Sequence, residues 1–495
     1  MRWRRCLWWL LVLTLTWSAG ALPALADGVL RVGVAEADIT PPKGFLVAGY
    51  YTERIATGTI DPLKARAMVF RTEQAQAAVV TCDLTHISVD LTVEVRRRAS
   101  ARTRIPAEHI ILTATHSHTA PDYTKDLYEY LGTNAEAVRK ERSYAAKLVS
   151  GIVDAIADAH AHADPATLEI ATARQETPVS FNRRFLMRDG SVRTWMNLEN
   201  PEVVRPAGPI DPNVGLLLVR SASGQPRGLL CNFALHLDTV GGTLWSADYP
   251  YYIEQTARKV LDPKLVFLFG NGCCGDINHV DPSKKERNKT DYVGRSLAKT
   301  MQSALPSLRR VEQPGLRVRR ATVPVPLQHV TAEQVAQARP LLLDARAGKQ
   351  VEFFDLVRAY KAVMLDQLRH KTPQTKPSEL INWGLSRTWA GVGDHLPVEV
   401  TVLAFGHDLA VVFLPGEIFV ELGLAIKQAS PFKTTLIIEL ANCAETLYVP
   451  TRVAYAGGGY EAINSAVKPG AGEMLAEAAV RLLGEIASEL SRPKR

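Results

Sequence analysis

Two histidines, His116 and His118, stand two residues apart just after the apolar run Ile110 to Ala114. If that run is a strand and continues, side chains at this spacing project to the same side. Imidazole nitrogens presented together at the end of a strand are typical of a metal site. Histidines held by ordinary hydrogen bonds are the alternative that this motif alone leaves open.

Two further polar side chains, His236 and Glu417, also follow apolar runs. Alone, each is weak, because a single histidine is common in a core and a glutamate opening a helix suits the helix dipole. Two histidine sites and a carboxylate would nevertheless hold a catalytic zinc, which uses three protein ligands and keeps a position for water. Such a metal lowers the pKa of its water to about 7 and polarises a carbonyl. These residues favour metal-assisted hydrolysis, although other divalent ions would fit the same ligands.

Two loops complete the segments that could carry chemistry. The first, Phe269 to His279, holds three glycines and the pair Cys273-Cys274. It could offer backbone N–H groups to an oxyanion, form tight turns with positive φ, or supply a thiol nucleophile. The second, Leu440 to Glu461, holds three tyrosines and a run of three glycines, and a surface lid is its alternative interpretation.

The elements expected to position these segments alternate between strands and helices. Strands are predicted at 30–34, 67–70, 78–82, 110–114, 168–173, 214–219, 228–234, 265–269, 398–405, 409–413 and 435–440. Helices are predicted at 91–103, 135–160, 249–261, 292–304, 419–428 and 472–491. The mixture predicts an α/β or α+β fold, a large sheet-based catalytic domain flanked by helices, with strands buried on both faces. Residues 331–395 are interpreted as a helical insertion, which begins at a capping box of Thr331 and Gln334.

The N-terminus carries the pattern of an export signal. Three arginines within residues 1–5 precede an apolar run, Cys6 to Trp17, and small residues follow up to Ala26. This order predicts a signal peptide at 1–26, a domain at 27–495, and a periplasmic or secreted protein. A membrane anchor is the alternative, but the apolar run is short for a span of about 20 residues.

Composition excludes some classes of function. The formal net charge is +7, and basic residues are scattered apart from short runs at 96–98 and 317–320, which we interpret as solvated faces. No nucleic-acid signature is present. After Cys6, five cysteines remain without a C-x-x-C pair, so most are expected to be buried free thiols rather than a disulfide framework or a structural zinc site.

These segments, in this order, resemble the neutral/alkaline non-lysosomal ceramidase family. The stretch RVGVAEADITP at residues 31–41, followed by Ala48-Gly49-Tyr50, is similar to the family's N-terminal signature. The resemblance covers nearly all of the chain after the signal peptide. It implies a zinc-dependent amidohydrolase of lipid (sphingolipid) metabolism, with one Zn2+ per chain, that cleaves the amide of ceramide to sphingosine and a fatty acid.

The resemblance also assigns roles to individual residues. It implies that the zinc ligands are His116, His236, Glu417 and Tyr448. Its other implied site residues are His118, which contacts substrate or a ligand and manages protons, Tyr460, which lines the substrate site, and Arg183, which positions substrate. Tyr460 and Arg183 would also stabilise the oxyanion.

Two departures from the family pattern keep the substrate open. Asn278 stands where the family carries a serine, which rules out a serine acyl-enzyme there but leaves zinc-activated water and a hydrogen bond from Asn278 to substrate or oxyanion. The family's C-terminal β-sandwich domain is also expected to be missing. The leading hypothesis is hydrolysis of ceramide or a related N-acylated lipid, with peripheral membrane contact. The alternatives are a zinc hydrolase of another amide or ester, water-soluble substrates included, and a non-catalytic binding member.

Overall fold

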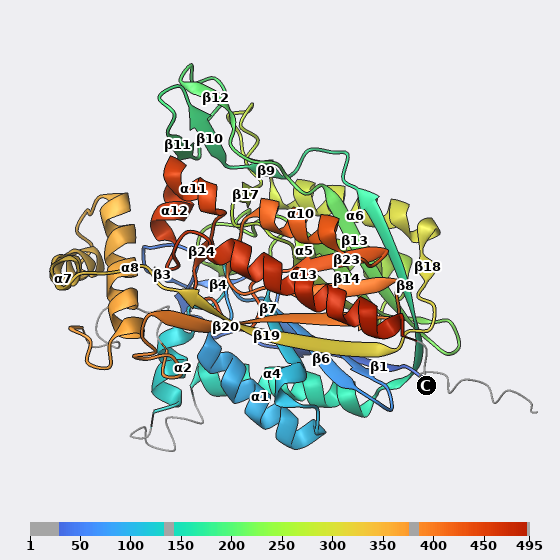
Figure 1. The fold of residues 1–495 in the computed structure, drawn as a ribbon. Helices are drawn as coiled ribbons and strands as arrows, with labels where there is room; N and C mark the ends of the chain where they lie inside the picture. The colour runs from blue at the N-terminus through green and yellow to red at the C-terminus, as the bar shows by residue number, and fades with distance from the viewer. Residues whose placement is uncertain (1–28, 133–142, 376–385, 493–495) are drawn as a thin grey trace, which may run out of the picture.

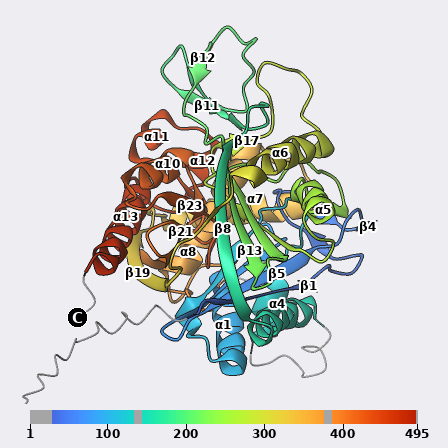
Figure 2. The same cartoon turned by 90° about the vertical axis from the view of Figure 1, so that its right-hand side faces the viewer.

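The structure, a computed structural model, describes residues 29–132, 143–375 and 386–492. The predicted signal peptide at 1–26 and the start of the helix predicted at 135–160 lie outside these residues. Two sheets packed face to face form the middle of the molecule, and helices cover both outer faces (Figures 1 and 2). The mixed α/β architecture predicted from the sequence is therefore confirmed as four layers.

The larger sheet has nine strands. Its order is β16-β14-β13-β8-β1-β5-β6-β7, with the short β18 (Arg309–Arg310) paired to β8. Its strands are β1 Arg31–Asp38, β5 Lys64–Arg71, β6 Gln76–Cys82, β7 Ile110–Ala114, β8 Asp164–Arg174, β13 Asn213–Ser221, β14 Pro226–Phe233 and β16 Val266–Asn271. Most neighbours run antiparallel, but β6–β7 and β14–β16 run parallel. Each end of the sheet thus carries a parallel pair, whose carboxyl ends lead into a site segment.

The smaller sheet has the order β19-β20-β21-β23. Its strands are β19 Leu316–Pro326, β20 His395–Phe405, β21 Leu409–Phe413 and β23 Thr434–Ile438. Alternation along the strands of the larger sheet separates two apolar surfaces. On β5, Met68 and Phe70 face the smaller sheet, where the ring of Phe70 lies 4.7 Å from that of Phe405, while Ala67 and Val69 face helices. The strands are therefore buried on both faces, as predicted.

Helices supply the two outer layers. The outer face of the larger sheet is covered by α1 Val89–Thr103, α4 Tyr144–Ala161, α5 Pro250–Val260 and α6 Thr290–Ala304. The smaller sheet is covered by α10 Val420–Ala429 and α13 Ala471–Leu490. Shorter elements connect the layers: β2 Leu46–Val47, β3 Arg54–Ile55, β4 Gly58–Thr59, α2 Thr124–Tyr130 and β15 Leu244–Trp245.

Two excursions from the layers lie between sheet strands. The predicted helical segment contains α7 Ala332–Arg346 and α8 Phe353–Arg369, which lie at one side of the molecule (Figure 1). Its capping box is present, since Thr331 Oγ1 accepts from the Gln334 amide and Gln334 Oε1 accepts from the Thr331 amide. The extent of the insertion, 331–395, stays a prediction, and residues 376–385 lie outside the described residues. A small sheet of β10 Arg184–Met187, β11 Val192–Thr194 and β12 Val203–Pro206 was not predicted and projects at the top of Figure 1.

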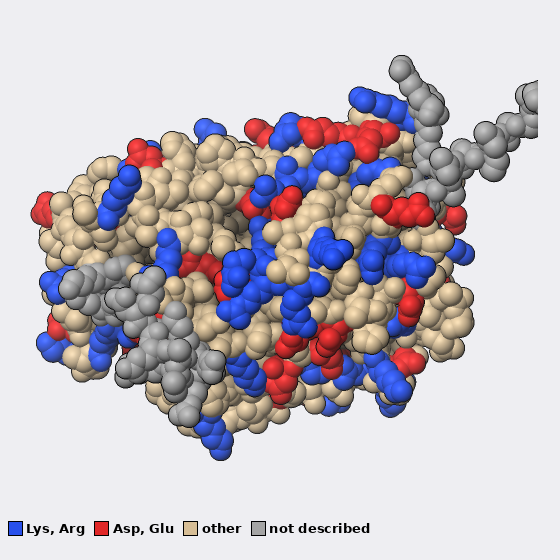
Figure 3. Space-filling model, turned by 90° about the horizontal axis from the view of Figure 1, so that it is seen from below, with Lys and Arg blue, Asp and Glu red and all other residues tan. Residues whose placement is uncertain are grey.

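The short basic runs are part of ion-paired surfaces. Arg97 and Arg98 pair with Glu94, while Arg317 and Arg319 pair with Glu489. On the face seen from below, positive and negative side chains are interspersed (Figure 3). Arg97 is exposed and Arg98 partly so, as a solvated face requires, but Arg96 is buried and pairs with Glu399, so the run at 96–98 is a solvated face only in part. Within the described part of the chain, we find no helix with both the length and the apolar character needed to cross a bilayer.

Candidate active site

Three of the four predicted zinc ligands converge. The carboxylate Oε2 of Glu417 lies 3.4 Å from Nε2 of His116 and 3.3 Å from Nε2 of His236. His116 follows β7 and His236 follows β14, at opposite ends of the larger sheet, whereas Glu417 follows β21 of the smaller sheet. The site therefore lies where strand ends of both sheets meet, and neither sheet could build it alone.

Unusual backbone conformations aim these ligands. His116 has a φ of +79°, which is uncommon for a residue with a side chain and marks stored strain at this position. Before Glu417, Gly416 has a φ of +71°, and a Cβ there would lie 2.0 Å from Thr446 Oγ1. Only glycine fits that turn. The turn leads into β22 (Glu417–Ile418), which pairs in parallel with β24 (Tyr448–Val449) and so places Tyr448 beside Glu417.

Backbone carbonyls fix the tautomers of both buried histidines. Nδ1 of His116 lies 2.7 Å from the Thr85 carbonyl oxygen, and Nδ1 of His236 lies 2.8 Å from that of Cys274. Because a carbonyl only accepts, each Nδ1 must carry the hydrogen. Each neutral ring then presents the lone pair of Nε2 to the space beside Glu417, as in a metal-ligating histidine with an oriented outer partner.

His118 closes the third side of this space. Its Nε2 lies 3.3 Å from Nε2 of His116, and ligand nitrogens of His116, His118 and His236 all lie within 4.8 Å of one another. Among the described residues, Glu417 Oε2 and His118 Nδ1 are buried without a hydrogen-bond partner. Nitrogen lone pairs and a carboxylate oxygen that face one another are satisfied by a cation, so the donor set fits a divalent metal.

The electrostatics keep most of the cluster in its metal-binding protonation state. Burial and Arg183 lower the pKa of His236 to about 4, and burial together with His116 holds the pKa of His118 well below its usual range. Burial alone would raise the pKa of Glu417, but His116 and His236 bring it well below its usual range. Against its own burial, the pKa of His116 is raised by the Glu417 charge.

Arg183 reaches the site from a segment outside the two main sheets. It follows β9 (Phe181–Asn182), which pairs with β17 (Ile277–Asn278). The buried guanidinium donates from Nη2 to the Gly275 carbonyl at 2.8 Å and to the Tyr448 hydroxyl at 3.1 Å, and its Nη1 lies 3.2 Å from His236 Nε2. The sequence-predicted arginine is thus in contact with two of the predicted ligands.

The two predicted tyrosines also lie together. The rings of Tyr448 and Tyr460 are 5.4 Å apart, and Tyr460 begins the short helix α12 (Tyr460–Asn464). Asn464 donates a hydrogen bond to the Tyr460 hydroxyl at 3.2 Å. Burial raises the pKa of Tyr460 to about 12, so its phenol stays protonated and can donate at neutral pH.

Asn278 is buried at the end of β17, two residues from Asp276, whose carbonyl accepts from the Arg183 amide. Its side-chain oxygen accepts from the Val280 amide at 3.2 Å, within its own loop. The structure therefore places Asn278 next to the Arg183 strand, and it does not bring Asn278 to the wall of the pocket described below.

The glycine-rich loop is explained by close packing. Its glycines do not have positive φ, and a Cβ at Gly275 would lie 2.6 Å from the Glu417 carbonyl oxygen. The amides of Gly272 and Gly275 donate to Phe233 and Ile418, so they are not offered to an anion. The positive-φ interpretation of these glycines is therefore wrong, and the amides of Gly272 and Gly275 are not available to an oxyanion.

The adjacent thiols are structural as well. Cys82, Cys231, Cys273, Cys274 and Cys443 are all free and buried, which confirms the prediction. The thiol of Cys274 donates to Glu439 Oε1 at 3.0 Å, and burial and that carboxyl raise its pKa well above the usual value. A thiol nucleophile is therefore disfavoured, because the thiolate is the reactive form.

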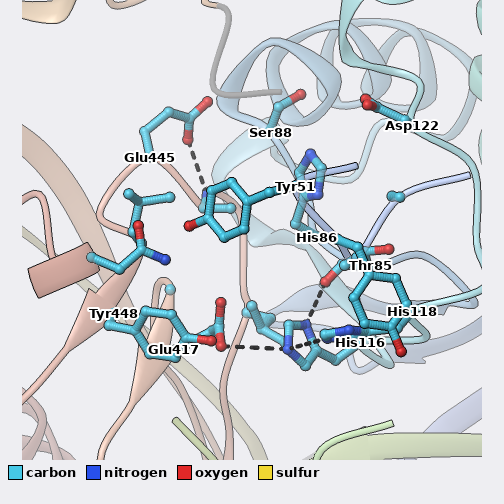
Figure 4. A pocket seen from close by; sticks show the side chains of 18 of the residues that line it. Tyr51, Thr85, His86, Ser88, His116, His118, Asp122, Glu417, Glu445 and Tyr448 are labelled. Carbon is cyan, nitrogen blue, oxygen red and sulfur yellow. Dashed lines mark hydrogen bonds and ion pairs between the residues drawn. The ribbon is translucent and has the colours of Figure 1, made fainter. Parts of the chain in front are cut away.

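A pocket with an empty volume of about 870 Å³, part of it open to solvent, leads from the cluster (Figure 4). His116, His118, Glu417 and Tyr448 lie together on one wall, and Ser88, Asp122 and Glu445 lie on the far side, with Tyr51 and His86 between them. Tyr460 also contributes to the lining. The wall facing the cluster is therefore partly acidic.

Several residues at the site were not predicted from the sequence. Glu461 is fully buried and accepts from Arg183 Nε at 2.7 Å. Asp238 accepts from His279 Nδ1 at 2.9 Å, and Glu445 accepts from the Val89 amide at 2.9 Å. Glu461 directly follows the predicted Tyr460, but nothing in the sequence distinguishes it from an exposed helical glutamate.

With this geometry established, comparison with known proteins decides the family. Residues 30–277, half of the chain, match the family described as neutral/alkaline non-lysosomal ceramidase, N-terminal. The chain belongs to this family. The resemblance inferred from the sequence motifs is thereby confirmed.

One relative matches part of the chain in sequence, and two solved structures match most of it in fold. A neutral ceramidase from Pseudomonas aeruginosa is 27% identical over 234 residues, which are 46% of this chain and 33% of that protein, so the match spans a third of the relative's length. The crystal structure of neutral ceramidase from the same organism superposes with a TM-score of 0.67 at 20% identity, covering 94% of this chain and 76% of that one. A structure described as ceramidase complexed with C2 gives a TM-score of 0.67 at 18% identity, covering 94% and 77%. At these identities the two structures show that the fold is shared.

Proposed function

We propose that this protein is a metal-dependent amidohydrolase that cleaves the amide bond of an N-acylated lipid, with ceramide as the first substrate to test. The observation that carries the proposal is the convergence of His116, His236 and Glu417, of which His116 and Glu417 line a pocket. Family membership supports the substrate class, because the related structures are named as ceramidases.

The proposed metal is one zinc ion per chain. His116, His236 and Glu417 would hold it, with Tyr448 beside Glu417 as the fourth ligand that the family pattern implies. When bound, such an ion polarises a carbonyl and acidifies a water. The fixed Nδ1 hydrogens make Nε2 the lone-pair atom of both rings, as this role requires, and Nε2 of His236 also accepts from Arg183 Nη1 at 3.2 Å.

The remaining residues would bind and orient the amide and move protons. Arg183 carries a fixed positive charge beside Tyr448, so its Nη atoms can stabilise negative charge that develops on the carbonyl oxygen. Tyr460 would add a second donor, since burial keeps its phenol protonated. His118, which is neutral because burial lowers its pKa, can accept a proton at a ring nitrogen. Asn278 Oδ1 is engaged with Val280, so only its amide nitrogen could reach toward a substrate.

A hydrolase of another amide or ester is the second candidate. Asp122 and Glu445 line the pocket opposite the cluster, and a wall with two carboxyl groups suits a substrate that carries an ammonium group there, which ceramide lacks. Asn278 in place of the family's serine favours the same alternative.

We also propose that the protein acts outside the cytoplasm, in the periplasm or after secretion, because of the signal peptide predicted at 1–26, and that it touches membranes only peripherally.

The test measures metal content and ceramide hydrolysis of the purified protein before and after chelation, in the natural protein and in His236→Ala. His329→Ala, an exposed histidine outside the site, is the matched control. About one zinc per chain and chelator-sensitive cleavage, both lost only in His236→Ala, are expected. Zinc without ceramide cleavage would direct the search to other amides and esters. An unaltered rate in metal-free His236→Ala protein would contradict the proposal, and absence of both metal and hydrolysis would leave a binding protein.

A further inference from the structure

Trp195, directly after β11, is an exposed tryptophan in a strained conformation. Its side chain is 47% exposed and its φ is +61°. A bulky side chain in the left-handed region is a genuine outlier, which persists only when its surroundings hold it there. The Trp195 amide donates to the Arg183 carbonyl oxygen at 2.9 Å, so the site's own arginine strand supplies that restraint.

The ring of Trp195 lies against two residues of the site. It is 4.8 Å from the ring of Tyr460, and the Arg183 guanidinium carbon is 5.9 Å from its centre. An indole that only stabilised the small sheet would be buried within it. Here one part of the ring contacts Arg183 and Tyr460, while about half of the side chain remains open to solvent.

Phe353 extends this aromatic surface from a different part of the chain. It is the first residue of α8, in the predicted helical insertion, and is 39% exposed. Its ring lies 6.0 Å from that of Trp195 and 5.8 Å from the rings of both Tyr460 and Tyr51. Tyr51 and Tyr460 line the pocket, so the exposed pair is continuous with the pocket wall.

We propose that Trp195 and Phe353, with Tyr51 and Tyr460, form an aromatic subsite that binds the acyl chain of the substrate outside the pocket. The insertion would then serve to bring Phe353 to Trp195. This inference rests on the proposed function, since it assigns one part of an N-acylated substrate to a surface that joins the catalytic cluster through Tyr460.

The chemistry of the surface selects this occupant. Two of the four rings are exposed, and flat apolar rings gain most from covering hydrocarbon, about fourfold in affinity for each methylene buried. A polar amine part of the substrate would gain nothing from these rings. Binding should therefore strengthen with chain length in the natural protein, and this dependence should flatten when the rings are removed.

The experiment compares Trp195→Ala, Phe353→Ala and the double variant on a series of N-acyl amides with two to eighteen carbons. Leu343→Ala, another exposed apolar residue of the insertion at 46% exposure, is the matched control. We expect kcat/KM for the long chains to fall about tenfold in each single variant, mainly through KM, and the loss to shrink as the chain shortens. A chain-length profile that equals that of the natural protein in both single variants would overturn the subsite and leave the proposed function standing.

A binding measurement separates the subsite from catalysis. Tryptophan fluorescence is recorded on the His236→Ala background while myristate or butyrate is added, and Trp195→Phe identifies the signal of Trp195. A fluorescence change with myristate alone that disappears in Trp195→Phe supports the subsite even if no amide is hydrolysed. No change with either acid in the folded protein would overturn it. Phe353→Ala provides the same test if Trp195→Ala fails to fold.

Discussion

Glu461 accepts a hydrogen bond from Arg183 Nε at 2.7 Å, with neither side chain more than 4% exposed. This contact fixes the Nε edge of the guanidinium, so that the Nη atoms are left to face His236 and Tyr448. A buried pair of this kind is weak support for stability, but breaking it leaves an uncompensated charge. We therefore interpret Glu461 as a positioning residue.

Glu461→Gln should lower kcat about ten- to a hundredfold with little change in metal content, because Arg183 loses its orientation while the ligands remain. Steady-state kinetics and metal analysis check this, with Glu485→Gln, at an exposed helical pair, as control. Recovery of part of kcat in Glu461→Asp would agree with positioning. An unchanged kcat in a folded Glu461→Gln protein would show that Arg183 is held by its other contacts.

Metal removal should destabilise the folded protein. Nitrogen lone pairs and the Glu417 carboxylate face one another, and a cation bound only by the native state adds about 4 kcal/mol when its concentration is a thousandfold above its Kd. Chelation should therefore lower Tm of the natural protein and have no effect on Glu417→Gln. Glu421→Gln, a carboxylate on the adjacent helix, should behave as the natural protein does. Equal Tm values with zinc and with chelator in the natural protein would refute a metal at this cluster.

Stability should fall with rising pH because of Asp122. Burial and the nearby Glu53 charge raise the pKa of Asp122 from 3.8 to about 7, and its Oδ1 is buried without a partner among the described residues. Between these two pKa values the native state keeps a proton that the unfolded chain has released, so the free energy of unfolding falls as pH rises. This loss of stability is complete above about pH 7. Below about pH 4 both states are protonated and the difference vanishes.

Asp122→Asn removes this dependence. At pH 8 the variant should be more stable than the natural protein, by at most about 4 kcal/mol, since one pKa unit corresponds to about 1.4 kcal/mol. Urea unfolding at pH 4, 6 and 8 measures the slope, and Asp154→Asn, at an exposed pair with Arg102, provides the control. Parallel curves for Asp122→Asn and the natural protein across this range would show that Asp122 does not titrate as proposed.

The sequence predicted local elements better than their assembly. The strand predictions at 110–114 and 409–413 coincide with β7 and β21, because apolar runs bounded by polar turns are fixed locally. The packing of two sheets was not predicted, since β20 pairs with β19 across the intervening helices α7 and α8. Such pairing depends on contacts distant in the chain, which periodicity does not contain.

The site shows the same division. The residues His116, His236 and Glu417 were found because each follows an apolar strand, and their meeting was implied by the family pattern. Glu461 was missed because its neighbours along the chain do not indicate burial; its role comes from Arg183, which is 278 residues away in the sequence. The glycines of the 269–279 loop were misinterpreted because each is required by close packing against a residue distant in the chain: Ile438 at Gly270, Ala234 at Gly272 and Glu417 at Gly275.

Gly33 tests how tightly the helical layer is packed on the larger sheet. A Cβ at Gly33, on β1, would lie 1.8 Å from the carbonyl oxygen of Ala159 on α4, so the helix or strand must shift to admit a methyl group. Overpacking of this kind costs about 1–3 kcal/mol, and we expect Gly33→Ala to be destabilised by about that amount in urea unfolding. Gly484→Ala is the matched control on α13, where nothing lies within 4 Å of the added Cβ. That variant should gain about 1 kcal/mol from helix propensity. A Gly33→Ala protein as stable as the natural one would mean that α4 can move away from β1 without loss.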